Sequence, residues 1–366
     1  MAEPVIAATK PELVSLKKGR SYFWCTCGRS QRQPYCDGSH QGTEFEPLQF
    51  KCDSDGDYLL CACKHTRSGP YCDGSHNNLS DSYEEASAEE VQATADLAIT
   101  QRSGGDTGKA LLDGGCYVKT LDRDALSCHQ NISIQSMIHP DDGARCLALF
   151  YLEAQGGDPA VMAFPGSHVA LFVLAGNGEI NISGKSFPLK QEQGIYVSAD
   201  EAFALQPADD SSPLQITATL CPGGNAPEWL DAMPDNFDES LQERVFSVDP
   251  GKREVMADRF YQVLIDDRIG SADMTQFVGE VPKSRAAFHH HLYEETITIL
   301  SGQGYMWTEG ARAEVKPGDV IFLPRRQMHS LECTDPGGMR LVGVFFPAGS
   351  PAVNYCAVTS RTGAGR

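Results

Sequence analysis

Two stretches of the chain repeat one pattern of cysteine and histidine: WCTCGRSQRQPYCDGSH at residues 24–40 and LCACKHTRSGPYCDGSH at residues 60–76. Each contains Cys-x-Cys, then eight residues, then Cys-Asp-Gly-Ser-His, with Pro-Tyr just before the third cysteine. Each stretch therefore offers three thiolates and one imidazole at the same intervals. These groups are ligands for iron and for zinc. The repeat predicts two metal-binding loops within one short N-terminal domain.

The repeat resembles the CDGSH iron-sulfur family, the mitoNEET group. That family has Ser or Thr between its Cys-x-Cys and its Pro-x-Cys-Asp-Gly-Ser-His, and Ser30 and Thr66 fill this position here. The resemblance covers roughly residues 13–77 and is greatest to the tandem, single-chain members. It implies two [2Fe-2S] clusters, the first bound by Cys25, Cys27, Cys36 and His40 and the second by Cys61, Cys63, Cys72 and His76.

Ligand chemistry agrees with iron-sulfur binding. Clusters are held by cysteine thiolates, and a histidine in place of a thiolate raises the reduction potential. Zinc is the main alternative because Cys3His is a zinc ligand set, although zinc sites usually pair two knuckles with wider cysteine spacing. A disulfide framework is disfavoured because the other cysteines show no pairing pattern: Cys52, Cys116, Cys128, Cys146, Cys221, Cys333 and Cys356.

Length, cysteine content and charge limit the protein class. A chain of 366 residues is expected to hold two or three domains, and 13 cysteines without a pairing pattern favour a reducing, cytoplasmic compartment. No signal peptide or bilayer-spanning run is seen, so no membrane partner is expected. Residues 1–80 are charge-neutral, whereas the rest of the chain has 21 basic and 40 acidic residues. Such a surface repels phosphate backbones, which argues against nucleic-acid binding.

The chain after the repeat divides by composition. We expect a tandem iron-sulfur domain at residues 1–80 and an acidic, partly helical linker at 81–114, where Ser82 and Glu85 form a capping box. Short alternating strands broken by Gly, Pro and Asp then predict small barrels or sandwiches. Leu-x-Gly-x-Gly at residues 174–178 recurs at 300–304, which indicates two copies of one strand-rich unit. The expected segments are a first barrel at 115–222, a linker at 223–258, a second barrel at 259–350 and a tail at 351–366.

The second copy contains a possible metal-binding strand, FHHHLYEE at residues 288–295. Alternate residues of a strand share one face. In a continuous strand His289, His291 and Glu295 would therefore point into the barrel, while His290 and Glu294 would point out.

This pattern resembles the cupin superfamily. Its first motif is matched by His289, His291, Glu295 and Gly302, and its second by Gly318, Pro324 and His329, with Arg326 where the family often has glycine. The resemblance covers roughly residues 115–350 and implies a bicupin of the double-stranded β-helix, or jelly-roll, type. It implies one divalent metal bound by His289, His291, Glu295 and His329. The mixed N/O ligand set suits Fe(II), our first choice, as well as Mn(II), Ni(II) and Zn(II).

The first copy lacks these ligands. Ala163, Pro165 and Val169 stand at the positions that correspond to His289, His291 and Glu295, and Leu205 lies near that of His329. His168 is isolated and is expected to pack or to lie at the surface. The first barrel is therefore expected to be structural. Several other residues near the motifs are expected to be core, surface or solvated loop residues: Tyr293, Tyr305, Trp307, Arg325, Arg326, Lys64 and His65.

These sites favour an enzyme, an iron-dependent cupin oxygenase or dioxygenase acting on a small organic molecule. The attached clusters would supply electrons or keep the cupin metal reduced, since tethering raises effective concentration. An external reductase is an expected partner, and homo-oligomerisation is left open. One alternative is a redox or iron sensor whose clusters regulate a cupin isomerase, hydrolase or ligand-binding module. Another is an iron-sulfur transfer protein that uses the bicupin for docking.

Overall fold

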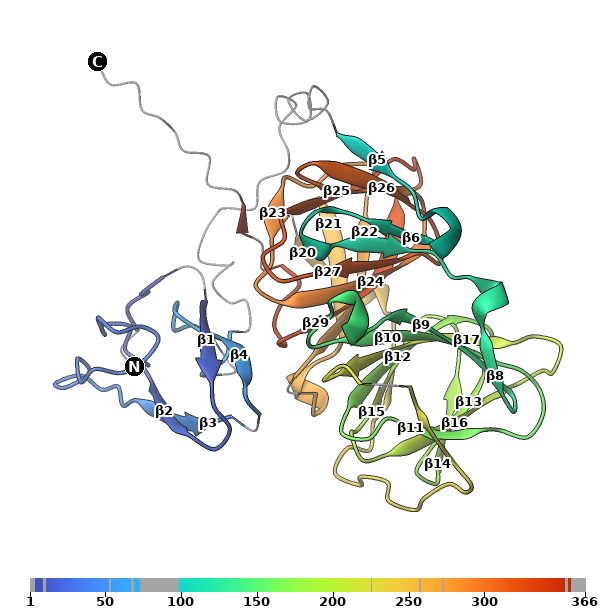
Figure 1. Ribbon diagram of the computed structural model, residues 1–366. Helices are drawn as coiled ribbons and strands as arrows, with labels where there is room; N and C mark the ends of the chain where they lie inside the picture. Colours follow the sequence, from blue (N-terminus) through green and yellow to red (C-terminus); the bar gives the residue numbers. More distant parts are fainter. Residues whose placement is uncertain are drawn as a thin grey trace. The chain divides into compact units, whose positions relative to one another are not determined.

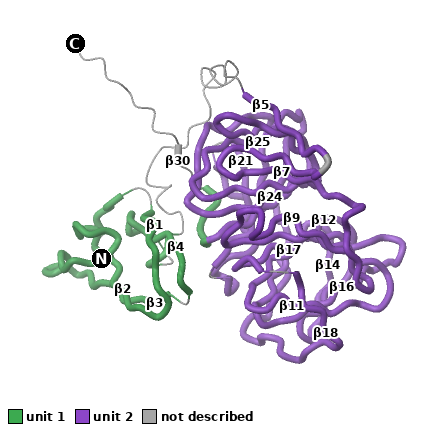
Figure 2. The backbone as a smooth tube through the Cα atoms, in the orientation of Figure 1, with its two compact units in different colours: residues 1–83, 347–354 green, residues 84–346, 355–366 purple. Residues whose placement is uncertain are grey.

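The computed structural model describes residues 4–8, 11–52, 54–66, 69–72, 99–224, 226–256, 258–271, 273–352 and 355–356. The regular structure there is strand, with short 3-10 turns (Figure 1). The chain forms two compact units, coloured separately in Figure 2: residues 1–83 with 347–354, and residues 84–346 with 355–366. The expectation of a mainly β protein is confirmed.

The N-terminal unit contains two antiparallel strand pairs. β1 (Glu12–Leu16) pairs with β4 (Gly56–Leu60), and β2 (Ser21–Trp24) pairs with β3 (Leu48–Lys51). Each Cys-x-Cys therefore follows directly on a strand, β2 in the first copy and β4 in the second. The two copies also make the same local contacts: Cys25 N–H donates to the Pro34 carbonyl and Cys61 N–H to the Pro70 carbonyl, both at 2.9 Å.

Apolar and aromatic side chains from both copies form one small core in this unit. Its buried members include two ligand cysteines of the second copy: Leu16, Trp24, Cys52, Tyr58, Leu60, Cys61 and Cys63. Ser30 Oγ donates to the Tyr35 carbonyl at 2.6 Å, and Thr66 Oγ1 donates to the Tyr71 carbonyl at 2.7 Å. The Ser/Thr position of the motif thus holds each ligand loop closed.

The first barrel consists of two facing sheets. The seven-stranded sheet has the order β19-β15-β12-β17-β10-β9-β8 and the five-stranded sheet the order β14-β13-β16-β11-β18. In chain order the strands are β8 (Ser127–His129), β9 (Ile132–Ile138), β10 (Ala148–Ala154), β11 (Val161–Ala163), β12 (His168–Ala175), β13 (Gly178–Ile182), β14 (Lys185–Leu189), β15 (Gln193–Val197), β16 (Ala202–Pro207), β17 (Leu214–Cys221), β18 (Glu228–Leu230) and β19 (Val245–Ser247).

The second barrel is also built from two sheets. Its eight-stranded sheet has the order β20-β21-β22-β29-β24-β27-β7-β6 and its six-stranded sheet the order β30-β23-β28-β25-β26-β5. The strands are β5 (Thr100–Arg102), β6 (Lys109–Leu111), β7 (Tyr117–Lys119), β20 (Glu254–Met256), β21 (Arg259–Ile265), β22 (Thr275–Val281), β23 (His289–His290), β24 (Glu294–Ser301), β25 (Gly304–Thr308), β26 (Ala311–Val315), β27 (Val320–Leu323), β28 (His329–Cys333), β29 (Met339–Phe346) and β30 (Tyr355–Cys356). Short 3-10 turns lie at Gly105–Thr107, Asp113–Gly115, Arg123–Ala125, Pro140–Asp142, Pro250–Lys252 and Asp267–Ile269.

Strand pairing crosses the domain limits expected from the sequence. β5 and β6 lie in the segment expected to be linker, yet β5 pairs with β26 and β6 with β7 in the second barrel. β18 and β19, in the other expected linker, complete the first barrel by pairing with β11 and β15. Each of these strands has only three residues, which is too short to show the alternation by which a strand is predicted from sequence. The helix expected near Ser82 lies outside the described residues.

The internal repeat seen in the sequence corresponds, in each barrel, to one turn that leads the chain from the larger sheet to the smaller one. Gly176 connects β12 to β13, and Gly302 connects β24 to β25. Both have positive φ angles, 86° and 78°, and an added Cβ would lie 2.5 Å from the Pro213 carbonyl oxygen or 2.3 Å from that of Gly338. Glycine is required at both positions because the turn is left-handed and the neighbouring chain is close.

The barrels pack against each other through their larger sheets. One apolar cluster joins Phe172 and Tyr196 of the first barrel to Val342 and Val344 of the second. A cavity of about 570 Å³ remains in this seam, with Tyr151, Phe172 and Arg340 among its lining residues. None of the second barrel's histidines lines this cavity, so the cavity belongs to the seam between the barrels.

No helix in the described part of the chain is long and apolar enough to cross a membrane.

Candidate functional site

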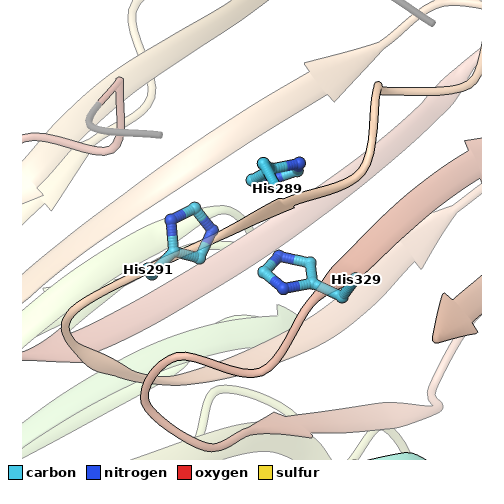
Figure 3. A group of neighbouring side chains, drawn as sticks. All are labelled: His289, His291 and His329. Carbon is cyan, nitrogen blue, oxygen red and sulfur yellow. The ribbon is translucent and has the colours of Figure 1, made fainter. Parts of the chain in front are cut away.

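Three buried histidines converge inside the second barrel (Figure 3). His289 lies on β23 and is paired with His329 at the start of β28, while His291 follows β23 in the turn that leads to β24. Their candidate ligand atoms all lie within 4.8 Å of one another. Each of these side chains is no more than 9% exposed. The pairing of β23 with β28 thus places His289 beside His329, which is 40 residues further along the chain. The turn after β23 adds His291 to the group.

Hydrogen bonds to the backbone orient two of the imidazoles. His289 Nδ1 lies 2.8 Å from the Ala287 carbonyl oxygen, and His329 Nδ1 lies 2.8 Å from the Gln327 carbonyl oxygen. A carbonyl accepts a hydrogen bond, so each Nδ1 carries the proton and Nε2 keeps its lone pair. Metal-binding histidines are commonly held in this way. Burial lowers the pKa of His329 to about 4 and that of His289 well below its usual range, so both are neutral at pH 7.

Glu295 lies beside this triad. Its Oε2 is 3.6 Å from His291 Nε2, and the side chain is almost fully buried. Burial raises the pKa of Glu295 to about 8. A buried carboxylate is costly unless a cation balances its charge, and the neutral imidazoles offer lone pairs to such a cation. The residues therefore fit a divalent metal, with His289, His291 and His329 as the central donors and Glu295 adjacent to them.

The residues next to the ligands depart in part from the expected alternation. The strand is interrupted at residues 291–293, so one continuous face does not exist. Glu294 points away from the triad but is buried, not solvated: its carboxylate accepts hydrogen bonds from the backbone N–H groups of Arg145, Cys146 and Leu147 at 2.8–2.9 Å. Glu294 thus joins the strand that carries Glu295 to the first barrel. The alternation of side chains along a strand could not predict the burial of Glu294, because the donors to its carboxylate are backbone groups of the first barrel.

Aromatic rings continue from the triad. Tyr293 stacks on His291 with centroids 4.4 Å apart and on Phe345 at 4.2 Å, and Phe345 lies 5.9 Å from Phe277. Tyr293 is therefore a packing residue, as expected. Gly343 leaves space for this stack, because a Cβ there would lie 2.3 Å from the Phe277 ring. The site combines nitrogen and oxygen donors with an apolar wall.

The second motif forms the turn between β27 and β28. Arg326, which occupies the family's glycine position, has a positive φ of 65°, and its backbone N–H donates to the His291 carbonyl at 2.7 Å. This conformation explains why glycine is usual there. Trp307 donates from Nε1 to Glu332 at 2.8 Å, and Arg285 and Arg312 lie over its ring. Trp307 is thus engaged in packing.

Apolar side chains fill the first barrel where the second has its histidines. Val169 and Leu205 are part of a fully buried hydrophobic cluster, which Phe237 and Trp229 of the expected linker help to cover. His168 lies outside this cluster and stacks on Tyr196, whose hydroxyl is 2.8 Å from His168 Nδ1. These contacts suit the packing role expected for His168.

The N-terminal unit brings its cysteines together in matching pairs. Cys25 and Cys27 have their Sγ atoms 3.7 Å apart, and Cys61 and Cys63 have theirs 3.5 Å apart. Two thiolates on one tetrahedral metal lie about 3.8 Å apart when the metal–sulfur bonds are ~2.3 Å. Cys36 Sγ is 3.2 Å from His40 Nδ1. His76 lies outside the described residues.

Backbone amides surround these sulfur atoms. Donors within hydrogen-bonding distance come from Arg29 to Cys27, Gly38 to Cys36, Lys64 to Cys61 and His65 to Cys63, at 3.2–3.5 Å. Amide hydrogen bonds stabilise thiolates and tune cluster potentials. The thiols and their surroundings therefore fit iron-sulfur clusters.

Lys64 differs from the expectation of a solvated loop residue. It is only 6% exposed, and its Nζ donates to the Cys61 carbonyl at 2.8 Å. His65 is half-buried, with Nδ1 2.8 Å from the Cys63 carbonyl oxygen. A comparison of the two copies could have drawn attention to Lys64, because the first copy has Gly28 at the same position.

Comparison with known families agrees with both halves of this description. The family model described as "Iron-binding zinc finger CDGSH type" matches residues 4–41, and the "Cupin domain" model matches residues 277–345. The chain thus joins a CDGSH iron-sulfur domain to a bicupin. These matches imply iron-sulfur binding in the first domain and a metal in the second.

Individual relatives match parts of the chain. CDGSH iron-sulfur domain-containing protein 3, mitochondrial, of Mus musculus is 52% identical over 52 residues, which is 14% of this chain and 38% of that protein. Quercetin 2,3-dioxygenase of Bacillus subtilis (strain 168) is 30% identical over 99 residues, 26% of this chain and 29% of that enzyme. The chain therefore spans well under half of either relative.

Solved structures resemble the two-barrel part. The putative glyoxylate-induced protein of Pseudomonas aeruginosa superposes with a TM-score of 0.52 at 14% identity, covering 69% of this chain and 96% of that one. At this identity the likeness concerns the fold alone. It agrees with the two-barrel cupin architecture expected from the sequence.

Proposed function

We propose that the protein is a metal-dependent cupin oxidoreductase, an iron oxygenase or dioxygenase for a small organic molecule, whose own [2Fe-2S] clusters supply electrons or keep its metal reduced. The observation that carries this proposal is a buried His289–His291–His329 triad with Glu295 beside it, in one chain with a CDGSH domain. Two clusters and one further metal would then be bound per chain.

The donor set supports iron chemistry. Three imidazoles and one carboxylate would leave two positions open on a six-coordinate ion, and such mixed N/O sites suit Fe(II). Bound there, Fe(II) would supply the redox and Lewis-acid chemistry of an oxygenase. The protein's own part is to hold the donors and to exclude water by burial. The similarity to quercetin 2,3-dioxygenase, although it covers only part of each chain, supports the same class.

The joining of the two domains supports an electron-supply role. A cluster tethered to the barrels is present at an effective concentration near millimolar for a short flexible linker. A cupin isomerase or decarboxylase would need no electron source, so clusters in the same chain are harder to explain for those activities. The proposed partners are a small-molecule substrate and an external reductase.

Oxygen consumption is the direct test of the proposed activity. Protein purified anaerobically with both clusters is reduced and screened with apolar and aromatic hydroxy compounds in an oxygen electrode. We expect substrate-dependent oxygen uptake, together with iron in excess of that held in the clusters. Manganese or zinc in the second barrel, together with no oxygen uptake, would instead support the alternative function. In that alternative the clusters sense redox state or iron and regulate a cupin without redox activity.

Electron supply has its own prediction. When the clusters are reduced anaerobically and the cupin iron is present as Fe(III), we expect the clusters to reoxidise as the cupin iron becomes Fe(II). Stopped-flow absorption follows the clusters, and electron paramagnetic resonance follows the Fe(III). The His291→Ala protein should keep both clusters and lose this reoxidation phase. If the cupin iron stays Fe(III) while the clusters are reduced, the electron-supply role is excluded.

The cluster ligands make a separate prediction. His40→Cys should lower the reduction potential of the first cluster by roughly 100 mV or more, because a thiolate donates more charge than an imidazole. His76→Cys should do the same to the second cluster. Redox titration followed by visible absorption measures both. One zinc per motif and no visible absorption in the parent protein would show that the sites hold zinc.

A further inference from the structure

The two Cys-x-Cys loops share a backbone conformation but differ in side chain at one position. Gly28 and Lys64 each follow the second cysteine, and their φ angles are 76° and 67°. In the first loop glycine is needed, because an added Cβ would lie 1.6 Å from the Val5 carbonyl oxygen. A lysine in this left-handed region is strained, whereas glycine is not. Lysine at this position therefore needs an explanation from its side chain.

The Lys64 side chain turns into the core of the module. Its Nζ donates to the Cys61 carbonyl at 2.8 Å and lies 4.7 Å from the centre of the Trp24 ring. Trp24 Nε1 donates to the same carbonyl at 2.8 Å. Trp24 directly precedes Cys25, so this contact joins the first ligand loop to the second. Among the described residues Lys64 takes part in no ion pair with a carboxylate.

A buried ammonium group needs a negative partner, and the nearby candidates are thiolates. The contacts of Nζ place it beside both loops, because the Cys61 carbonyl belongs to the second Cys-x-Cys pair and Trp24 directly precedes the first. The lysine thus lies between the two sets of cluster ligands.

We propose that Lys64 is a fixed cation shared by the two clusters, which raises both reduction potentials and reduces the repulsion between the clusters. A [2Fe-2S]²⁺ cluster with three thiolates and a neutral imidazole has a net charge of −1, and uptake of one electron makes it −2. A cation at close range in a dry setting favours the more negative state. This inference rests on cluster binding by the module and not on the proposed oxygenase activity.

The test is a reductive titration of the full chain. Dithionite supplies one electron to each cluster under anaerobic conditions, and electron paramagnetic resonance follows the reduced species; His40→Cys and His76→Cys backgrounds assign each potential to a cluster. Lys64→Met removes the charge and keeps the volume, and we expect both potentials to become more negative. At the parent midpoint the ratio of reduced to oxidised cluster should fall severalfold in each. Lys64→Arg should retain values close to the parent.

Two further variants keep the result interpretable. Lys64→Gly copies Gly28, suits the left-handed backbone and should show the same negative shift if Lys64→Met fails to assemble. Lys51→Met removes an exposed cation of the same unit and should leave both potentials unchanged, because solvent screens it. Unchanged potentials in Lys64→Gly and Lys64→Met, or a shift in one cluster alone, would overturn the inference. A parent protein without visible absorption or acid-labile sulfide would instead overturn cluster binding itself.

Discussion

Replacing His289, His291 or His329 with alanine should remove the cupin metal and, with it, oxygen uptake. Each imidazole is buried within a triad whose candidate ligand atoms lie within 4.8 Å of one another. Loss of a group that only hydrogen-bonds to a metal ligand typically costs 10–100-fold in metal affinity, so loss of a direct ligand should cost about 100-fold or more.

The measurement must separate barrel iron from cluster iron. Each [2Fe-2S] cluster contains one acid-labile sulfide per iron, so total iron minus sulfide gives the iron held elsewhere. The parent protein should show close to one excess iron per chain, and each alanine variant close to none. Cluster absorption should be the same in all of them, which reports that the N-terminal module is intact.

Three variants serve as controls for this prediction. His290→Ala removes the neighbouring histidine of the same run and should keep the metal, and His168→Ala in the first barrel should do so as well. Glu295→Gln should give intermediate loss, because Glu295 contacts His291 from the edge of the triad. Equal metal loss in His168→Ala would mean that the first barrel also binds metal, contrary to its apolar interior.

The local motifs carried most of the information about the sites. Spacing within 17 residues was enough to predict cysteines that meet in pairs, because each loop is closed by its own hydrogen bonds, such as Ser30 to Tyr35. The histidine triad was also predictable, even though the assumed continuous strand is broken at residues 291–293. The turn still returns the chain to the same barrel interior. His289, His291 and His329 therefore converge although the strand is not continuous.

Features that depend on distant backbone groups could not be predicted. Glu294 looks like a surface residue by alternation, yet its partners are amides 147–149 residues away. β5, β6 and β19 have three residues each, too few for a recognisable alternation, and each pairs with a strand of a barrel sheet that the sequence could not assign to it. Lys64 is polar and lies in a loop, and only the three-dimensional closeness of the two copies encloses it.

The second large effect expected is on stability, from a buried ion pair of the first barrel. Arg244 and Glu201 are joined by two hydrogen bonds of 2.6 and 2.8 Å, and their side chains are 0% and 2% exposed. Glu201→Gln would leave a guanidinium group buried without its counter-charge. Breaking a buried pair from one side typically costs 3–5 kcal/mol. In barrels of this size that corresponds to a decrease of roughly 10 °C in melting temperature.

Each partner keeps backbone hydrogen bonds when the other is replaced. In Arg244→Met the Glu201 carboxylate still accepts from the Ser198 and Asp238 backbone N–H groups, at 3.0 and 2.8 Å. In Glu201→Gln the Arg244 guanidinium still donates to the Leu241 and Tyr196 carbonyls. Both single variants should nevertheless lose stability, because each leaves one buried charge without its counter-charge. Replacing both residues with methionine removes the unpaired charge and should recover part of the stability. Differential scanning calorimetry of the full chain measures all three, with cluster absorption as the check on the N-terminal unit.

A matched exposed pair shows whether burial is the cause. Arg268 and Asp266 are also 2.7 Å apart, but the arginine side chain is 69% exposed. Arg268→Met should change stability by less than about 1 kcal/mol, as exposed ion pairs usually do. If Glu201→Gln melts within 2 °C of the parent, or the double variant is less stable than both single variants, the Arg244–Glu201 pair does not hold the first barrel together.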